Sequence, residues 1–166
     1  MYIIISGTNR TDSYTIKVST EYQRLLQKQG IESALLSLQG LDVSERNPAF
    51  EKVERALIIP AQKVIFVAPE YNGSIPGVLK SMFDISDIKP AWARKKALLV
   101  GVSTGRAGNL RGMEHLTGIL HYLRMVVHPN KLPISVVDRL FDTSGHIADA
   151  ATLSAMEAQL NEFIVF

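Results

Sequence analysis

Five short apolar runs alternate with stretches of helical spacing, and this alternation constrains the fold more than any other feature of the chain. Near-continuous apolar runs rich in β-branched residues are typical of strands buried on both faces of a parallel sheet. The five runs, each predicted to be a strand, are Tyr2 to Ser6, Ile31 to Leu38, Lys63 to Ala68, Lys96 to Val102 and Met125 to His128.

Helical spacing fills the intervals between these runs. The first interval has an i, i+4, i+7, i+8 pattern that ends before Gly30, formed by Val18, Tyr22, Leu25 and Leu26. Further helices are predicted over Glu51 to Ala61, Gly77 to Asp87, Gly112 to Leu123 and Ile147 to Phe163. Because parallel neighbours need helical crossovers, the chain predicts a doubly wound, three-layer α/β sandwich.

Length and composition narrow the functional classes. The 166 residues suit a single domain, residues 1–166, and the absence of Cys excludes disulfides and thiolate chemistry, as expected of a cytoplasmic protein. A net charge of +2 is too balanced for a nucleic-acid binder. No apolar run approaches the ~20 residues of a membrane span, and the N-terminal run is predicted to be a strand instead of a signal peptide. The basic stretch from Arg94 to Lys96 is predicted to be a solvated strand entrance.

Ligands of doubly wound sheets bind outside the carboxyl ends of the strands, so the loops after the first, third and fourth strands are the candidate site. The first loop, Ser6 to Thr15, contains five hydroxyl side chains besides that of Tyr14, together with Arg10, directly before a helix. This donor set suits a phosphate group. An alternative is a polar loop in which Ser13 only caps the helix. Neither a Walker A loop nor a three-glycine Rossmann fingerprint is present.

The other two loops are punctuated by glycine. Pro69 to Gly77 combines Asn-Gly and Pro-Gly turns, and Pro76 fits a helix start. Its turn N–H groups suit hydrogen bonds to a planar heterocycle, and Tyr71 offers an aromatic edge. The loop from Ser103 to Asn109 is a second polar turn that precedes a helix.

These loops resemble those of the NADPH-dependent FMN reductases, a family that includes quinone, azo-dye and chromate reductases. The loop from Gly7 to Thr15 is similar to the family pattern Gly-Ser-x-Arg-x-x-Ser-Phe-Asn, and Pro69 to Lys80, PEYNGSIPGVLK, is the most specific match. The resemblance implies a flavodoxin-like three-layer αβα sandwich with a five-stranded parallel sheet in the order 2-1-3-4-5. Thr15, Ile85 and Asn109 depart from the family pattern, which puts the substrate in doubt more than the cofactor.

The resemblance also implies how the site residues divide. In the first loop, Thr8, Arg10, Ser13 and Thr15 are expected to hold the phosphate of FMN, and Tyr14 is a further expected cofactor-binding residue. The residues of the second loop that are expected to line the isoalloxazine ring are Pro69, Glu70, Tyr71, Asn72, Gly73 and Ser74. The residues of the third loop that are expected to approach the pyrimidine edge of the ring are Ser103, Thr104, Gly105 and Gly108.

The implied activity is electron transfer from NAD(P)H through FMN to a small acceptor such as a quinone, azo compound, metal oxyanion or free flavin. No protein nucleophile, base or metal is required, because the flavin carries the chemistry. Two alternatives remain: a flavodoxin-type electron carrier and a flavin-free domain on the same fold. The four histidines are predicted to be ordinary surface or interface residues, and Trp92 a packing residue.

A homodimer, or a tetramer built from dimers, is predicted from apolar residues that one helical stripe cannot accommodate. In the helix after the second loop these are Val78, Leu79, Met82, Phe83, Ile85 and Ile88. In the helix after the third loop they are Met113, Leu116, Ile119, Leu120, Tyr122 and Leu123. A charge at Met82 or Leu120 is therefore expected to disrupt the interface.

Overall fold

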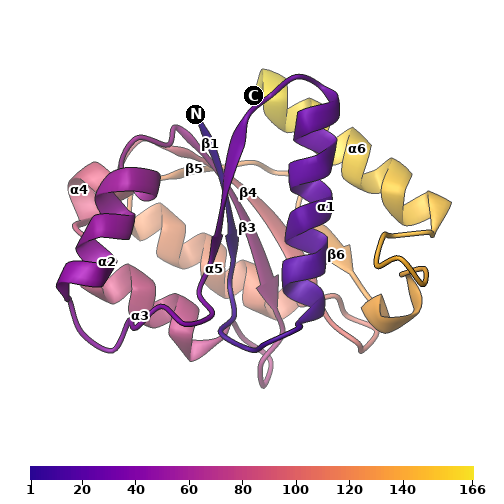
Figure 1. Cartoon of the computed structure of the whole chain (residues 1–166), viewed down its shortest axis with the longest axis horizontal. Coiled ribbons are helices and arrows are strands. Elements are labelled where there is room, and N and C mark those ends of the chain that lie inside the picture. The colour runs from indigo at the N-terminus through magenta and orange to yellow at the C-terminus, as the bar shows by residue number, and fades with distance from the viewer.

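A parallel sheet forms the centre of the protein, whose computed structural model describes all residues, 1–166. The strand order is β2-β1-β3-β4-β5, as predicted, with a further strand, β6, paired to β4. The strands are β1 (Tyr2–Ser6), β2 (Ser33–Ser37), β3 (Lys63–Pro69), β4 (Lys96–Val102), β5 (Val126–Val127) and β6 (Leu132–Ile134). Every named pair is parallel, so the carboxyl ends share one edge, the lower edge in Figure 1.

The sixth strand corrects the predicted count of five. The last predicted run forms only the two-residue β5, which pairs with the start of β4, and β6 then pairs with the end of β4. Pro129 lies between the two segments. Proline has no N–H to donate to a ladder, so the edge strand is interrupted there and resumes after the turn.

Helices cover both faces of the sheet. α1 (Tyr14–Lys28) and α6 (Ala150–Val165) pack on one face, and α2, α3, α4 and α5 on the other (Figure 1). The bounds of the second group are α2 (Pro48–Val53), the π-helix η1 (Glu54–Ile58), α3 (Gly77–Ile85), α4 (Ile88–Ala91) and α5 (Leu110–Tyr122); a 3-10 turn, η2 (Val137–Arg139), precedes α6. None of these helices has the length and apolar character needed to cross a bilayer.

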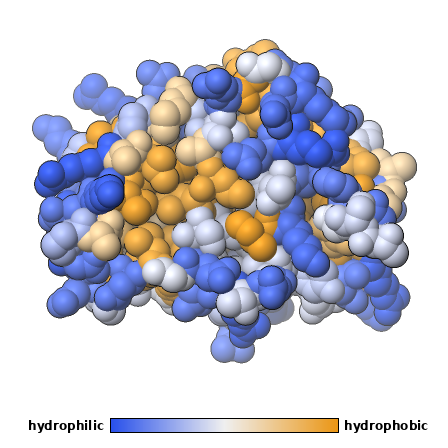
Figure 2. Space-filling model, in the orientation of Figure 1, coloured by the Kyte–Doolittle hydropathy of each residue, from blue (hydrophilic) through white to orange (hydrophobic).

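Each face of the sheet has its own apolar core. Trp92 is fully buried in the core beneath α2 to α5, with its ring centroid 5.2 Å from Phe83 and 6.0 Å from Phe66, which confirms its predicted packing role. On the opposite face, Val18 of α1 and Leu160 of α6 are fully buried. Figure 2 shows apolar surface over the free edge strand β2, on the side toward α2. The sheet is thus covered on both faces but open at this edge.

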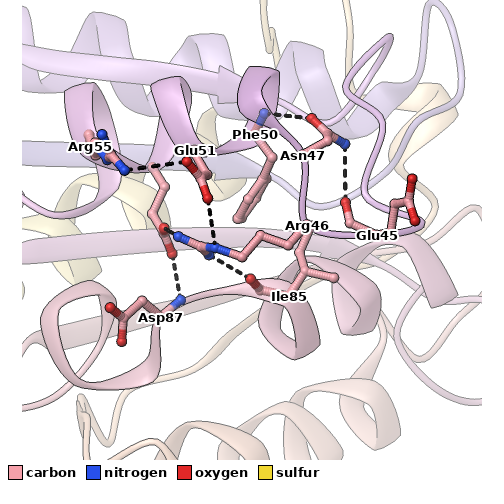
Figure 3. A network of polar contacts seen from close by, with 9 residues as sticks. Glu45, Arg46, Asn47, Phe50, Glu51, Arg55, Ile85 and Asp87 are labelled. Atoms are coloured by element: carbon pink, nitrogen blue, oxygen red, sulfur yellow. Dashed lines mark hydrogen bonds and ion pairs between the residues drawn. The ribbon is translucent and has the colours of Figure 1, made fainter.

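A buried carboxylate explains two differences from the predicted helices. Glu54, in η1, accepts hydrogen bonds from Arg46 Nη2 and from the Asp87 backbone N–H, both at 2.7 Å. Arg46 also donates to the Ile85 carbonyl at 2.7 Å, as Figure 3 shows. These contacts bind the last residue of α3 and the residue before α4, so the predicted helix from Gly77 to Asp87 ends at Ile85 and a separate short helix follows.

Three lysines at the amino ends of β3 and β4 hydrogen-bond to carbonyls at helix ends. Lys95 donates to Ile58 and Ile59, Lys63 to Phe163 and Ile164, and Lys96 to Phe166. The prediction of a solvated strand entrance is wrong for Lys95, which is buried. Free carbonyls at a helix end need donors, and the sequence pattern does not reveal that Lys95 reaches them.

Burial makes the stability contribution of Lys95 depend on pH. Desolvation lowers the pKa of its ammonium group to about 8, with partial compensation from the charge of Glu54. The unfolded chain holds this proton up to a pKa of about 10.4. Between the two values the unfolded state binds more protons, so the penalty for the buried charge is present below pH 8 and is relieved as the pH rises.

We therefore expect wild-type protein to gain about 1–2 kcal/mol of unfolding free energy relative to Lys95→Met between about pH 7.5 and pH 10. Denaturant unfolding of both proteins at several pH values measures the difference, and subtraction removes the other groups that titrate. Parallel stability curves would contradict a buried ammonium at this position.

Candidate cofactor site

A cavity of about 200 Å³ lies where the loops after β1, β3 and β4 meet, at the carboxyl edge of the sheet. All three loops contribute to its wall. The predicted site residues that line it are Thr8, Arg10, Ser13, Tyr14, Thr15, Glu70, Tyr71, Ser103 and Thr104. Thr11, another hydroxyl of the first loop, also lines it, as do Val102 and Val137, which the sequence did not single out. Pro69, Asn72, Gly73, Ser74, Gly105 and Gly108 do not line this cavity.

The first loop is held tightly against the sheet. The Gly7 N–H donates to the Val67 carbonyl at 2.8 Å. A Cβ on Gly7 would lie 3.1 Å from that carbonyl oxygen and 2.9 Å from Leu79 Cδ2, so glycine is required by the close approach. Ser13 caps α1 by accepting from the Ile16 N–H at 3.2 Å. The hydroxyls of the loop, Arg10 and the positive end of α1 thus meet at one place, as a phosphate requires.

Tyr71 of the second loop contacts the first loop directly. Its hydroxyl oxygen lies 2.7 Å from Thr8 Oγ1. The guanidinium carbon of Arg10 lies 4.2 Å from the centre of the Tyr71 ring. The Arg10 backbone N–H also donates to Thr8 Oγ1, at 3.3 Å. The two loops are therefore linked by side chains as well as by the sheet.

The rest of the second loop is a tight turn beside this contact. Tyr71 and Ser74 exchange backbone hydrogen bonds of 2.9 and 3.1 Å. Asn72 and Gly73, between them, both have positive φ, 52° and 75°, as a type I′ turn requires. The Ser74 hydroxyl lies 2.9 Å from His115 Nδ1 of α5. The turn thus has a fixed backbone, and Asn72 at its tip is exposed.

The third loop packs closely against the end of β4. Ser103 Oγ accepts from the Gly108 N–H and donates to the Gly105 carbonyl, both at 3.0 Å. Asn109 adopts a left-handed conformation with φ of 63°, and its Nδ2 donates to the Ala68 carbonyl at 2.9 Å. Asn109 therefore joins the third loop to the strand that precedes the second. The tolerance of Asn for positive φ is the only sequence signal of this role.

The histidines divide between surface and core. His128 is buried, so its prediction as a surface or interface residue is wrong; its Nδ1 accepts from the Asn130 N–H at 3.3 Å and its ring meets Phe166 edge-on. The other three histidines are exposed. No histidine lines the cavity between the three loops.

The sheet order and the donor-rich loop at the start of α1 define a flavodoxin-like protein with a site for a phosphorylated ligand. The family model for NADPH-dependent FMN reductases matches residues 2–137. The chain belongs to this family, which confirms the predicted resemblance and identifies it as an oxidoreductase that uses FMN and NAD(P)H. Membership favours the reductase over the electron-carrier alternative.

Individual relatives agree with this assignment. The chain is 32% identical to an NAD(P)H-dependent FMN reductase of Pseudomonas aeruginosa, over 94% of this chain and 89% of that protein. It is 30% identical to a quinone reductase of Pseudomonas putida, over 96% and 90%. Among solved structures, the flavoenzyme NAD(P)H:(acceptor) oxidoreductase of Paracoccus denitrificans superimposes with a TM-score of 0.85 at 21% identity, covering 99% of this chain and 94% of that one. The last similarity confirms the fold.

Proposed function

We propose that the three loops hold FMN and that the protein passes electrons from NAD(P)H to a small quinone-type acceptor. The observation that carries the proposal is the convergence of hydroxyl groups, Arg10 and a helix N-terminus on one cavity. The choice of acceptor is supported by relatives named quinone reductase and by a 2-hydroxy-1,4-benzoquinone reductase from Burkholderia that is 24% identical over 96% of this chain.

The residues present fit FMN. A cavity of about 200 Å³ is smaller than the ~300–1,000 Å³ of whole ligand pockets, so it suits one end of the ligand, and the donors that line it suit the phosphate end. Thr8, Arg10, Ser13 and Thr15 would hold that phosphate. The rest of the second loop, from Asn72 to Ser74, and the loop from Ser103 to Gly108 remain for the isoalloxazine ring.

Bound FMN supplies the redox chemistry, accepting two electrons from the nicotinamide and passing them to the acceptor. The protein supplies position and fixed dipoles. Arg10 would offset part of the phosphate charge, and the hydroxyls would donate hydrogen bonds to it. In the Tyr71–Ser74 turn, the N–H groups of Tyr71 and Ser74 bond within the turn, so the donors left for a ring are the N–H groups of Asn72 and Gly73, which these bonds hold in place. Donors fixed in this way need little reorganisation when charge develops on a bound ring.

Reconstitution tests the proposal. Purified protein mixed with FMN is expected to show a bound-flavin spectrum at equimolar ratio, and to bind FMN more tightly than FAD because the donors of the first loop suit a terminal phosphate. NADPH or NADH consumption in the presence of benzoquinones is then expected. Absence of flavin binding would overturn the proposal, and flavin binding without nicotinamide oxidation would favour the electron carrier.

We also propose that the protein forms a homodimer, or a tetramer of dimers, through α3, α4 and α5. Met82 and Leu120 are fully buried in the chain's own core, so the expectation that a charge there would test the interface is wrong. The apolar surface left over is smaller: Tyr122 is 81% and Ile88 45% exposed, and both border an apolar groove with Ile119. Exposed apolar grooves of this kind favour an interface.

The dimer is expected to weaken at least about tenfold in Tyr122→Glu, because a carboxylate replaces an apolar contact at the proposed two-fold interface. Light scattering across a concentration series measures this. Val165→Glu is the matched control, since Val165 is 85% exposed on α6, in the other helical layer. A wild-type monomer at micromolar concentration would contradict the proposal.

The location of the protein in the cytoplasm stays a prediction.

A further inference from the structure

The hydrogen bond between the hydroxyls of Tyr71 and Thr8 uses only one of their two protons. Each hydroxyl can donate one hydrogen bond and accept two. The 2.7 Å bond between the two oxygens uses one of the two protons, whichever residue donates it. The Arg10 N–H already occupies an acceptor position on Thr8. The second hydroxyl proton of the pair is therefore left to donate to a partner outside the pair.

The position of Thr8 limits what that partner can be. Thr8 is only 1% exposed and lines the cavity together with Arg10 and Ser13. Glu70, the one carboxylate that lines the cavity, makes no hydrogen bond to either hydroxyl of the pair. An unpaired donor in a buried position is costly. The complementary partner is a group that only accepts hydrogen bonds, and a phosphate oxygen meets this requirement with the additional strength of a charge.

Tyr71 also holds the cation of the site. The Arg10 guanidinium lies over the Tyr71 ring at 4.2 Å, within the range of a cation–π contact. Arg10 forms no ion pair within the chain, and its side chain is exposed. A guanidinium already placed beside the cavity loses less conformational entropy when it binds an anion.

We infer that Tyr71 is a positioning residue for the phosphate end of the cofactor, and not a ring-lining residue as its motif implies. Its hydroxyl directs a proton of the Thr8–Tyr71 pair toward the phosphate, and its ring holds Arg10 beside it. A residue of the second loop thereby sets the preference of the first loop for phosphorylated over unphosphorylated flavin. The inference deepens the proposed function and rests on it.

Comparison of FMN with riboflavin, which lacks the phosphate, tests the inference. Tyr71→Phe keeps the ring beneath Arg10 but removes the hydroxyl, so FMN binding is expected to weaken about fivefold while riboflavin binding is unchanged. Tyr71→Leu removes both contacts, and FMN binding is expected to weaken about twentyfold or more. Flavin fluorescence titration measures both dissociation constants, and inorganic phosphate should compete with FMN less well in both variants than in wild type.

Two further variants complete the experiment. Tyr2→Phe removes a hydroxyl at the opposite edge of the sheet and should leave both dissociation constants unchanged. In a Thr8→Val background, Tyr71→Phe should have a smaller effect than in wild type, because the hydrogen bond between the two hydroxyls is already lost. Equal weakening of FMN and riboflavin, or no change in either, would overturn the inference. Failure of wild-type protein to bind any flavin would instead overturn the proposed function.

Discussion

Substitution of Gly101 by alanine is expected to lower the free energy of unfolding by about 3 kcal/mol. Gly101 lies near the end of β4, where the third loop folds back against the strand. A Cβ at this position would lie 2.0 Å from the Gly108 carbonyl oxygen, 3.0 Å from Met113 Cε and 3.1 Å from Asn109 Cβ. The carbonyl is backbone and cannot rotate away, so the whole loop must shift.

Denaturant unfolding of wild type and Gly101→Ala measures this effect. Gly77→Ala is the matched control, because a Cβ on Gly77 meets no atom within 4 Å and the residue is at the start of a helix. The control should keep wild-type stability. Gly101→Ala should also weaken FMN binding, since the displaced loop carries Ser103 and Thr104. Unchanged stability in Gly101→Ala would mean that the third loop is not packed as described.

Substitution of Arg10 by alanine is expected to weaken FMN binding by about tenfold to a hundredfold, the equivalent of about 1.5–3 kcal/mol of charge-assisted hydrogen bonding. Arg10 is the only cation that lines the cavity between the three loops. Its side chain is exposed and takes no part in the core, so the fold should be unaffected. Riboflavin binding should change much less than FMN binding.

Arg106→Ala provides the control for loss of charge. Arg106 is exposed in the third loop, near the site in sequence, but does not line the cavity. Its substitution should leave the FMN dissociation constant within about twofold of wild type, as for a screened surface charge. Dissociation constants are measured by fluorescence titration at fixed salt. If Arg10→Ala binds FMN as tightly as wild type, Arg10 does not belong to the phosphate site.

The order of the sheet could be predicted from the sequence because each buried strand is a continuous apolar run, and because the family resemblance supplies the strand order. Details that depend on tertiary contacts could not. The end of α3 at Ile85 depends on Arg46, nearly forty residues earlier in the chain. The burial of Lys95 depends on carbonyls at the end of η1. Neither contact leaves a periodic signal in the residues around it.

The candidate site shows the same limit. Nine of the fifteen predicted cofactor residues line one cavity. They could be predicted because each group is a short continuous segment at the end of a strand, and the ends of parallel strands meet at one edge of the sheet. The direction of a single side chain within a motif is a different matter. Tyr71 reaches Thr8, 63 residues away, and Val137 enters the wall from a segment after β6. Only the folded chain brings these residues together.

The lysines at the amino edge of the sheet have a consequence for how the protein can change. Lys63, Lys95 and Lys96 tie helix ends to β3 and β4, at the edge opposite to the loops that form the site. These anchors between helices and sheet are therefore separated in space from the residues that line the candidate site. Loop sequences at the carboxyl edge can diverge, and even exchange between homologues, without loss of these anchors. Such separation makes the scaffold well suited to acquiring new electron acceptors through loop replacement alone.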